Sequence, residues 1–334
     1  MLETSIDTFS QNQEFSPTDW QRPVIQELES VEARLHEVPE GQNEFLTAAS
    51  ARLLSSGGKR VRPTLNLLAA GLFDTLDQHA VSIAAAVEML HTATLVHDDL
   101  IDRSLIRRGV STLNADTSTD ITVLTGDYLF ARSANMVAEA DNVRVMQLFS
   151  KTLMTILNGE INQRFSKWQI DRPTYYDRIY AKTAAMFVLA TQSAAVIGKA
   201  NQTDQGAMIE YGRNIGMAFQ IMDDVLDFTG DQVRIGKPVG SDLRQGIITL
   251  PAIYYIETNA DEPSVQDFLK YNHRTDDIVQ RMVEEIRESD AIQEAVSEAR
   301  RFVLNGQRSL ESFPSTKYSR SLFRLTEYII ERDL

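Results

Sequence analysis

The chain has 334 residues, of which 43% are hydrophobic and 24% are charged, so it is long enough for one large domain or two ordinary ones. Its formal net charge of −14 argues against a surface that binds nucleic acid or an anionic membrane, because such a surface needs a basic face. The absence of cysteine excludes disulfides and thiol redox chemistry, and it fits a cytoplasmic location.

The N-terminal stretch does not have the pattern of a signal peptide. Residues 1–20 are polar and acidic, without a basic start or an apolar core. No apolar run approaches the length that spans a bilayer, so we expect a soluble protein without a transmembrane segment. Ser16-Pro17 and Arg22-Pro23 interrupt regular structure. We therefore predict a poorly ordered tail at residues 1–23, followed by one domain at residues 24–334.

Apolar residues recur at helical spacing through most of the remaining chain, and strand signals are nearly absent. The predicted helices span Val24–Val38, Asn43–Leu54, Pro63–Phe73, Gln78–Asp102, Thr119–Ala140, Asn142–Lys167, Thr174–Gly198 and Thr203–Thr229, with a mostly helical remainder from Leu250 onwards. Several of these helices are apolar all round, which indicates central helices that others bury. The sequence therefore predicts an all-α, single-domain, large helical bundle with a central cavity between helices.

The helix predicted at residues 78–102 ends in three acidic side chains. Asp98 and Asp102 lie one turn apart on one face, and Asp99 lies beside them. These carboxylates repel one another, and the dipole at a helix C-terminus favours cations over acids. One DDxxD sequence by itself is also compatible with a solvated helix end. A bound divalent cation would remove the electrostatic conflict.

A second DDxxD sequence, at residues 223–227, ends the helix predicted at residues 203–229. Asp223 and Asp227 share a face, with Gln220 and Phe219 one turn earlier on it. Two acid clusters on apolar helices are expected to face each other across a cavity. Carboxylate oxygens suit magnesium, which keeps several waters and also binds substrate phosphates. The pair of motifs therefore predicts a magnesium site between the two helices.

With these motifs in this order, the chain resembles the trans-isoprenyl diphosphate synthases (polyprenyl synthetases) from about Leu53 to Ile256, and its pattern is similar to that of the medium- and long-chain members. The matching pieces are Gly57-Gly58-Lys59-Arg60-Val61-Arg62-Pro63, His91, Asp98-Asp99-Leu100-Ile101-Asp102, Arg107-Arg108-Gly109, Lys182-Thr183, Phe219-Gln220, Asp223-Asp224-Val225-Leu226-Asp227 and Gly236-Lys237. The resemblance implies the isoprenoid synthase fold, a homodimer, and a prenyltransferase. This enzyme would condense isopentenyl diphosphate head to tail (1'-4) with an allylic diphosphate to give an all-trans polyprenyl diphosphate.

The resemblance also implies roles for individual residues. Three magnesium ions would be held by Asp98, Asp102 and Asp223, with Asp227 as a further ligand and Asp99 and Asp224 as additional ligands or partners of the ligands. Isopentenyl diphosphate would be bound by Lys59, Arg62, His91 and Arg108. The allylic diphosphate would be bound by Arg107, Lys182, Thr183, Gln220 and Lys237.

Each cationic motif has an ordinary alternative when it is taken alone. The segment at residues 57–63 could be a charged loop, His91 a core histidine and Lys182 a surface lysine. The sequence also departs from the family, because Ile247 stands where many members carry a lysine. Either Arg244 or a main-chain amide substitutes for that lysine, or the diphosphate is held by one cation fewer.

Residues before the first acid cluster bear on product length, because in the family bulky aromatic side chains there stop the growing chain early. Ala93 and Thr94 are small, and Leu90 and Met89 lie deeper on the helix. The sequence therefore predicts a product longer than C20, from heptaprenyl to decaprenyl. Geranylgeranyl (C20) or farnesyl diphosphate is the alternative product.

Two other functions are alternatives to a chain-elongating synthase. A terpene cyclase-like lyase ionises the same substrates but needs no second diphosphate site, which leaves no function for Lys59, Arg62, His91 and Arg108. A regulatory subunit would stabilise an active partner, but such subunits in the family tend to lose one acid cluster. Both clusters are intact in this chain.

Overall fold

The structure is a computed structural model, and it describes residues 19–39, 43–55, 58–107, 109–230, 239–270 and 275–331. Its elements are η1 (Arg22–Val24), α1 (Ile25–His36), α2 (Glu44–Ser55), α3 (Val61–Leu72), α4 (Gln78–Ile101), β1 (Ile106–Arg107), β2 (Val110–Ser111), α5 (Leu113–Asp116), α6 (Thr119–Ala138), α7 (Val143–Phe165), α8 (Arg172–Ile179), η2 (Tyr180–Ala184), α9 (Ala185–Ile197), α10 (Gln202–Thr229), α12 (Ser241–Arg244), α13 (Leu250–Thr258), α14 (Pro263–Leu269), α15 (Asp276–Glu288), α16 (Ala291–Ser309) and α17 (Lys317–Glu331).

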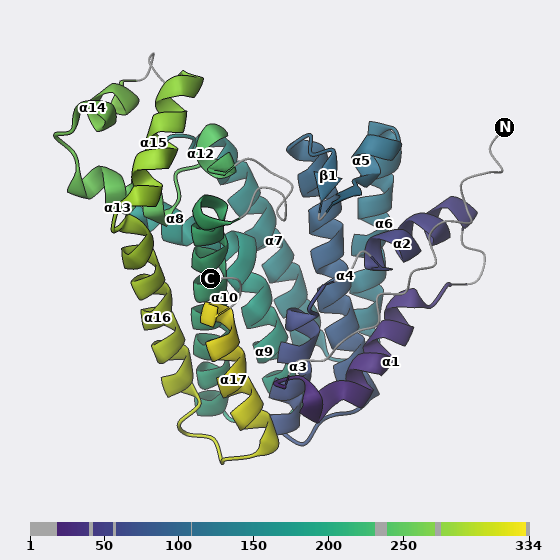
Figure 1. The fold of residues 1–334 in the computed structure, drawn as a ribbon. Coiled ribbons are helices and arrows are strands. Elements are labelled where there is room, and N and C mark those ends of the chain that lie inside the picture. Colours follow the sequence, from purple (N-terminus) through teal and green to yellow (C-terminus); the bar gives the residue numbers. More distant parts are fainter. Residues whose placement is uncertain are drawn as a thin grey trace.

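The long helices run side by side and form one bundle, which confirms the predicted all-α class (Figure 1). At its centre α4 packs against α3 and α6, and α10 packs against α9 and α16. The short helices α12, α14 and α15 gather at one end of the bundle (Figure 1). In the described residues the strands are limited to β1 and β2, which pair antiparallel with Arg107 opposite Val110.

Helix composition explains which helices are central. In α9 nearly every residue from Ala185 to Val196 is buried, as expected for a helix that is apolar all round. In α17 the buried apolar side chains are Leu322, Leu325 and Ile329, which recur at helical spacing on one face. Amphipathic helices of this kind cover the apolar central ones.

The predicted tail is only partly within the described residues. Residues 1–18 lie outside them, so the prediction is not tested there. Trp20 is only 3% exposed, and its ring lies 5.4 Å from that of Tyr328. The amide Nε2 of Gln21 donates to the carbonyl oxygen of Lys59 at 2.9 Å. The packed part of the chain therefore includes Trp20 and Gln21, which precede the predicted boundary.

Helix α4 is long and apolar enough, by length and composition, to cross a membrane, with a mean hydropathy of 1.3 over an 18-residue window. The prediction that no apolar run approaches that length is therefore wrong for this helix. In the structure 72% of the same window is buried inside the protein. Packing against other helices, rather than lipid, accounts for its apolar character.

The helix predicted at residues 174–198 is divided into α8, the π-helix η2 and α9. A π-turn places its hydrogen bonds between residues five apart, and such turns occur often at functional sites. Apolar periodicity does not reveal it, because the three segments follow one another without a break in the sequence pattern. The predicted Lys182-Thr183 pair lies in this π-turn.

Candidate active site

The first acid cluster, Asp98, Asp99 and Asp102, lies at the C-terminal end of α4. Asp99 is buried and accepts hydrogen bonds from Arg107, with Nε at 2.9 Å from Oδ2 and Nη2 at 2.8 Å from Oδ1. Asp102 is the C-cap residue of α4, and its Oδ1 accepts a hydrogen bond from Nη2 of Arg164 at 2.8 Å. The pair of strands after α4 thus brings Arg107 back to the cluster, and its predicted contact with the allylic diphosphate stays a prediction.

Asp98 differs from its neighbours because it is half-buried among other acids. Burial, the carboxylate of Glu160 and that of Asp102 raise the pKa of Asp98 to about 7, although the positive charges of Lys182 and Arg107 oppose this. The two positive charges thus do not offset burial and the neighbouring carboxylates. A cation bound beside Asp98 would relieve that deficit.

The second acid cluster, Asp223, Asp224 and Asp227, lies near the C-terminal end of α10. Asp223 and Asp227 are half-buried on one face, whereas Asp224 points into the protein and is buried. Burial and the nearby Asp242 carboxylate raise the pKa of Asp227 to about 7, and the same two causes raise that of Asp224 to about 7. The main-chain N–H of Asp242 also donates to Oδ2 of Asp227 at 3.2 Å.

Asp224 is held by two side-chain donors. The Tyr175 hydroxyl donates to Oδ2 at 2.8 Å, and Nε2 of Gln220 donates to Oδ1 at 2.9 Å. The hydroxyl of Thr183 in turn donates to Oε1 of Gln220 at 2.5 Å. The predicted substrate ligands Thr183 and Gln220 are thus brought together with each other and with the second acid cluster.

Lys182 lies near the first acid cluster and near Asp242. Desolvation lowers its pKa, but the negative charges of Glu160, Asp242, Asp98 and Asp102 outweigh this and raise the pKa above its ordinary value. Asp98 and Asp102 belong to the first cluster, whereas Asp242 lies next to the second. The Lys182 side chain is nevertheless exposed to solvent. Lys182 therefore interacts with the first cluster directly and with Asp242, whose main-chain N–H contacts Asp227 of the second cluster.

Two glycines allow the π-turn to lie this close to its neighbours. A Cβ atom on Gly159 of α7 would lie 2.4 Å from Cβ of Ala181. A Cβ atom on Gly216 of α10 would lie 2.5 Å from Cα of Ala184. Only glycine permits such approaches without a shift of the backbone. Lys182 is thereby held between α7 and α10.

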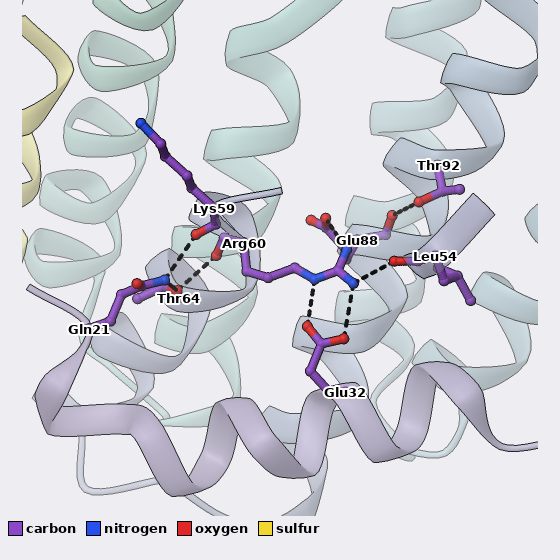
Figure 2. A network of polar contacts seen from close by, with 8 residues as sticks. All are labelled: Gln21, Glu32, Leu54, Lys59, Arg60, Thr64, Glu88 and Thr92. Atoms are coloured by element: carbon purple, nitrogen blue, oxygen red, sulfur yellow. Dashed lines mark hydrogen bonds and ion pairs between the residues drawn. The ribbon is translucent and has the colours of Figure 1, made fainter. Parts of the chain in front are cut away.

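In the glycine-rich segment before α3, the side chains of Lys59 and Arg60 lie in different surroundings (Figure 2). Arg60 is buried, and its guanidinium donates to Glu32, to Oε1 of Glu88 at 2.9 Å and to the carbonyl oxygen of Leu54 at 2.8 Å. Lys59 points away from Arg60 and is exposed (Figure 2). Arg60 therefore stabilises the packing of α1, α2 and α4 around this segment and is not available to substrate.

The predicted ligands of isopentenyl diphosphate lie on several elements. The Nζ atom of Lys59 lies 4.9 Å from the ring centre of Tyr328 in α17. The guanidinium carbon of Arg62 lies 5.2 Å from the ring centre of Phe187 and 5.9 Å from that of Phe219, one turn before the second acid cluster. His91 is half-buried on α4, two turns before Asp98.

Two predicted ligands, Arg108 and Lys237, lie outside the described residues.

Ile247, which stands where many family members carry a lysine, lies within the described residues. Arg244 is exposed, with its guanidinium bonded to the Gln280 side chain and, at 3.4 Å, to the carbonyl oxygen of Val239. The amide N–H of Ile247 donates to the carbonyl oxygen of Asp242 at 2.9 Å. The Arg244 guanidinium and the Ile247 N–H therefore have protein partners, and the substitute for the missing lysine stays a prediction.

The residues predicted to affect product length, Ala93, Thr94, Leu90 and Met89, are all buried on α4.

The sequence did not reveal four further residues of the site, Glu160, Arg164, Asp242 and Tyr175. Glu160 and Arg164 carried a weak signal, because they lie one turn apart near the end of a long helix. Asp242 and Tyr175 gave none, since their role depends on contacts with α10.

Comparison with known proteins identifies the family of the chain. A model of the polyprenyl synthetase family matches residues 43–286. The chain is 36% identical over 312 residues to heptaprenyl diphosphate synthase component 2 of Geobacillus stearothermophilus, covering 92% of this chain and 96% of that protein.

Solved structures with the same fold include heptaprenyl diphosphate synthase from Staphylococcus aureus, with a TM-score of 0.88, 31% identity and coverage of 96% of this chain and 100% of that one. The decaprenyl diphosphate synthase from Rhodobacter capsulatus has a TM-score of 0.86, 31% identity and coverage of 94% and 98%. The family is generally metal-dependent and uses isopentenyl diphosphate and allylic diphosphates as substrates. With two acid clusters at the C-terminal ends of α4 and α10 and a family model matching most of its length, this chain belongs to the polyprenyl synthetase family and is a prenyltransferase.

Proposed function

We propose that this prenyltransferase elongates an allylic diphosphate with isopentenyl diphosphate to a trans-polyprenyl diphosphate longer than C20, in the cytoplasm, with magnesium as its metal. The observation that carries this proposal is that Lys182 interacts with Asp98 and Asp102 of the first acid cluster and with Asp242, which contacts Asp227 of the second. A diphosphate carries several negative charges, so it needs cations that bridge it to the acidic side chains. The lysine and bound metal would provide that bridge.

The chemistry of the acid clusters fits magnesium. In the described residues no group of three or more His, Cys, Asp or Glu side chains is arranged to hold a metal by itself. Magnesium does not require such a cage, because it commonly takes one or two carboxylates, several waters and substrate phosphates. Asp98, Asp102, Asp223 and Asp227 would hold three ions in this way. When bound, the metal would neutralise charge on the diphosphate leaving group.

The side chains of the chain would act on the reacting groups as follows. Lys182 and Arg107, with Lys237, would orient the allylic diphosphate and stabilise its negative charge as the bond from carbon to oxygen breaks. Lys59, Arg62, His91 and Arg108 would place isopentenyl diphosphate so that its double bond attacks the allylic carbon. A proton is then lost to the released diphosphate. The buried apolar residues of α4 and α9 exclude water, which would otherwise capture the allylic cation.

Product analysis tests this proposal directly. The purified protein is incubated with magnesium, isopentenyl diphosphate and farnesyl diphosphate, and the hydrolysed products are separated by chain length. We expect products beyond twenty carbons. Diphosphate release without isopentenyl diphosphate would instead indicate a lyase. Elongation that begins only when a second protein is added would indicate that the chain needs a partner.

We predict that Ala93→Phe shortens the product. Ala93 is fully buried on α4, one turn and a residue before Asp98, so an aromatic ring there would fill space that a growing chain needs. Chromatography of the products with farnesyl diphosphate as primer measures the effect, and Ala93→Ser, which adds little volume, is the matched control. An unchanged product in Ala93→Phe would show that another residue sets the length.

We further propose that the protein is a homodimer that pairs through α7. Met154, Leu157, Ile161 and Phe165 are exposed at spacings of three and four residues, so they form one apolar stripe, and Phe165 is 84% exposed. Exposed stripes of this kind mark interfaces. The stripe carries no acidic side chain, which allows two copies of a chain with net charge −14 to approach there.

Leu157→Glu should convert the dimer to monomer, weakening self-association roughly 100-fold or more, because a charge buried without a partner costs several kcal/mol. Light scattering coupled to size exclusion measures the mass. Leu304→Glu on α16 is the control, since Leu304 is similarly exposed but lies on another helix. A wild-type protein that is monomeric, or a Leu157→Glu protein that still dimerises, would refute this interface.

A further inference from the structure

Tyr175 is a buried polar side chain to which the proposed reaction assigns no role. It belongs to α8 and is only 1% exposed. Its hydroxyl donates to Oδ2 of Asp224 at 2.8 Å, in the interior of the protein. The guanidinium carbon of Arg178 lies 5.4 Å from the ring centre, and Arg178 also donates to the carbonyl oxygen of Ile248. The ring and the hydroxyl of Tyr175 are therefore both fixed in place.

The other oxygen of Asp224 is held from the π-turn. Gln220 donates to Oδ1 through Nε2, and its own Oε1 accepts from Thr183. Thr183 and Tyr175 belong to one continuous segment, and they hold Asp224 from two sides, one directly and one through Gln220. Both carboxylate oxygens of Asp224 thus have protein donors. This leaves the exposed face of the second acid cluster to Asp223 and Asp227.

The π-turn explains how one segment makes both contacts. In a regular α-helix Thr183 would point about 80° away from Tyr175, since each residue turns the helix by roughly 100°. η2 replaces part of that regular helix with a π-turn, whose residues each turn the chain less than those of an α-helix, so Thr183 comes closer to the direction of Tyr175. Thr183 is accordingly buried, whereas Lys182 is exposed.

We propose that Tyr175 is a positioning residue for the second acid cluster. With Thr183, which acts through Gln220, it clamps Asp224 on the buried side of α10. This clamp keeps the last turns of the helix in the orientation that directs Asp223 and Asp227 at the metal. The inference rests on the proposed metal-dependent function of this cluster. It assigns Asp224 to support of the metal site, and it gives the π-turn a role in building that site.

Tyr175→Phe and Tyr211→Phe form a matched pair that separates positioning from folding. Both tyrosines are fully buried, and the Tyr211 hydroxyl donates to the carbonyl oxygen of Leu322 at 2.7 Å, at the other end of α10. We expect both variants to show a similar fall in the urea midpoint. Only Tyr175→Phe should raise the magnesium concentration for half-maximal activity, by up to about 10-fold, the lower end of the range for residues bonded directly to metal ligands, because Tyr175 acts one step further away through Asp224. Its KM for isopentenyl diphosphate should stay within about twofold.

Thr183→Val and Thr183→Ser test the contact that Thr183 makes with Asp224 through Gln220. They also keep the proposal testable if Tyr175→Phe does not fold. Thr183→Val should shift the magnesium response in the same direction, and Thr183→Ser, which keeps the hydroxyl, should restore it. The clamp is overturned if Tyr175→Phe responds to magnesium as Tyr211→Phe does, or if Thr183→Val changes only the KM for farnesyl diphosphate. A wild-type protein that forms no polyprenyl product would overturn the proposed function itself, which distinguishes the two failures.

Discussion

Asp98→Ala and Asp223→Ala are each expected to lower kcat by about 10²–10³-fold, the scale for loss of one group that stabilises a developing charge. Asp98 belongs to the first acid cluster and Asp223 to the second. A metal bound at either cluster loses a carboxylate in these variants. Product formation from radiolabelled isopentenyl diphosphate at saturating magnesium measures the effect. Near-normal turnover in either variant would refute the assignment of that residue to the metal.

Folding controls make this result interpretable. Asp98 lies beside Glu160 and Asp102, so its removal relieves repulsion and is not expected to lower the melting temperature. Asp261→Ala changes an exposed aspartate after α13 and should leave kcat within about twofold, as usual for surface substitutions away from a site. A variant that loses activity while it keeps its melting temperature has lost a functional group and has not unfolded.

Arg60→Ala is expected to lower the free energy of unfolding by about 3–5 kcal/mol, the cost of removing one partner from a buried ion pair. The Glu88 side chain is only 9% exposed, and it would keep its charge without the guanidinium that now neutralises it. The carbonyl oxygen of Leu54 would also lose a donor. Urea unfolding followed by circular dichroism measures the change.

Arg22→Ala is the matched control for this prediction. Arg22 lies nearby on η1 and pairs with Asp19, but its side chain is 75% exposed, and exposed pairs contribute about 0–1 kcal/mol. Arg60→Lys should recover part of the loss, because lysine keeps the charge but not the planar fork that meets two carboxylates. Equal stability of Arg60→Ala and Arg22→Ala would show that the buried network contributes little.

Most of the fold was predictable because its determinants are local. Apolar spacing placed the helices at residues 78–102 and 203–229 to within a few residues, and it correctly gave an all-α bundle. The spacing of Asp98 to Asp102 and of Asp223 to Asp227 likewise fixed which acids share a face. These are properties of one helix at a time, so neighbouring residues in the sequence contain the information.

The roles within each motif were decided by tertiary contacts. The sequence does not distinguish Arg60 from Arg62, two residues later. The structure does, because Glu32 and Glu88 converge on Arg60 from two other helices, whereas Arg62 lies over Phe187 and Phe219. A cation becomes structural when buried acids surround it, and those acids lie 28 residues away on either side.

Packing likewise determines where the π-turn interrupts the predicted helix. Residues 174–198 have the periodicity of one helix, and only the close approaches of Gly159 and Gly216 and the bonds from Tyr175 and Thr183 show where η2 interrupts it. The sequence by itself determined the helices, the two acid clusters and the family of the reaction. The tertiary structure alone decided that Glu160 and Asp242 join those clusters and that Lys182 interacts with Asp98, Asp102 and Asp242. Charges interact through space, and the distances that set their energies exist only in the folded chain.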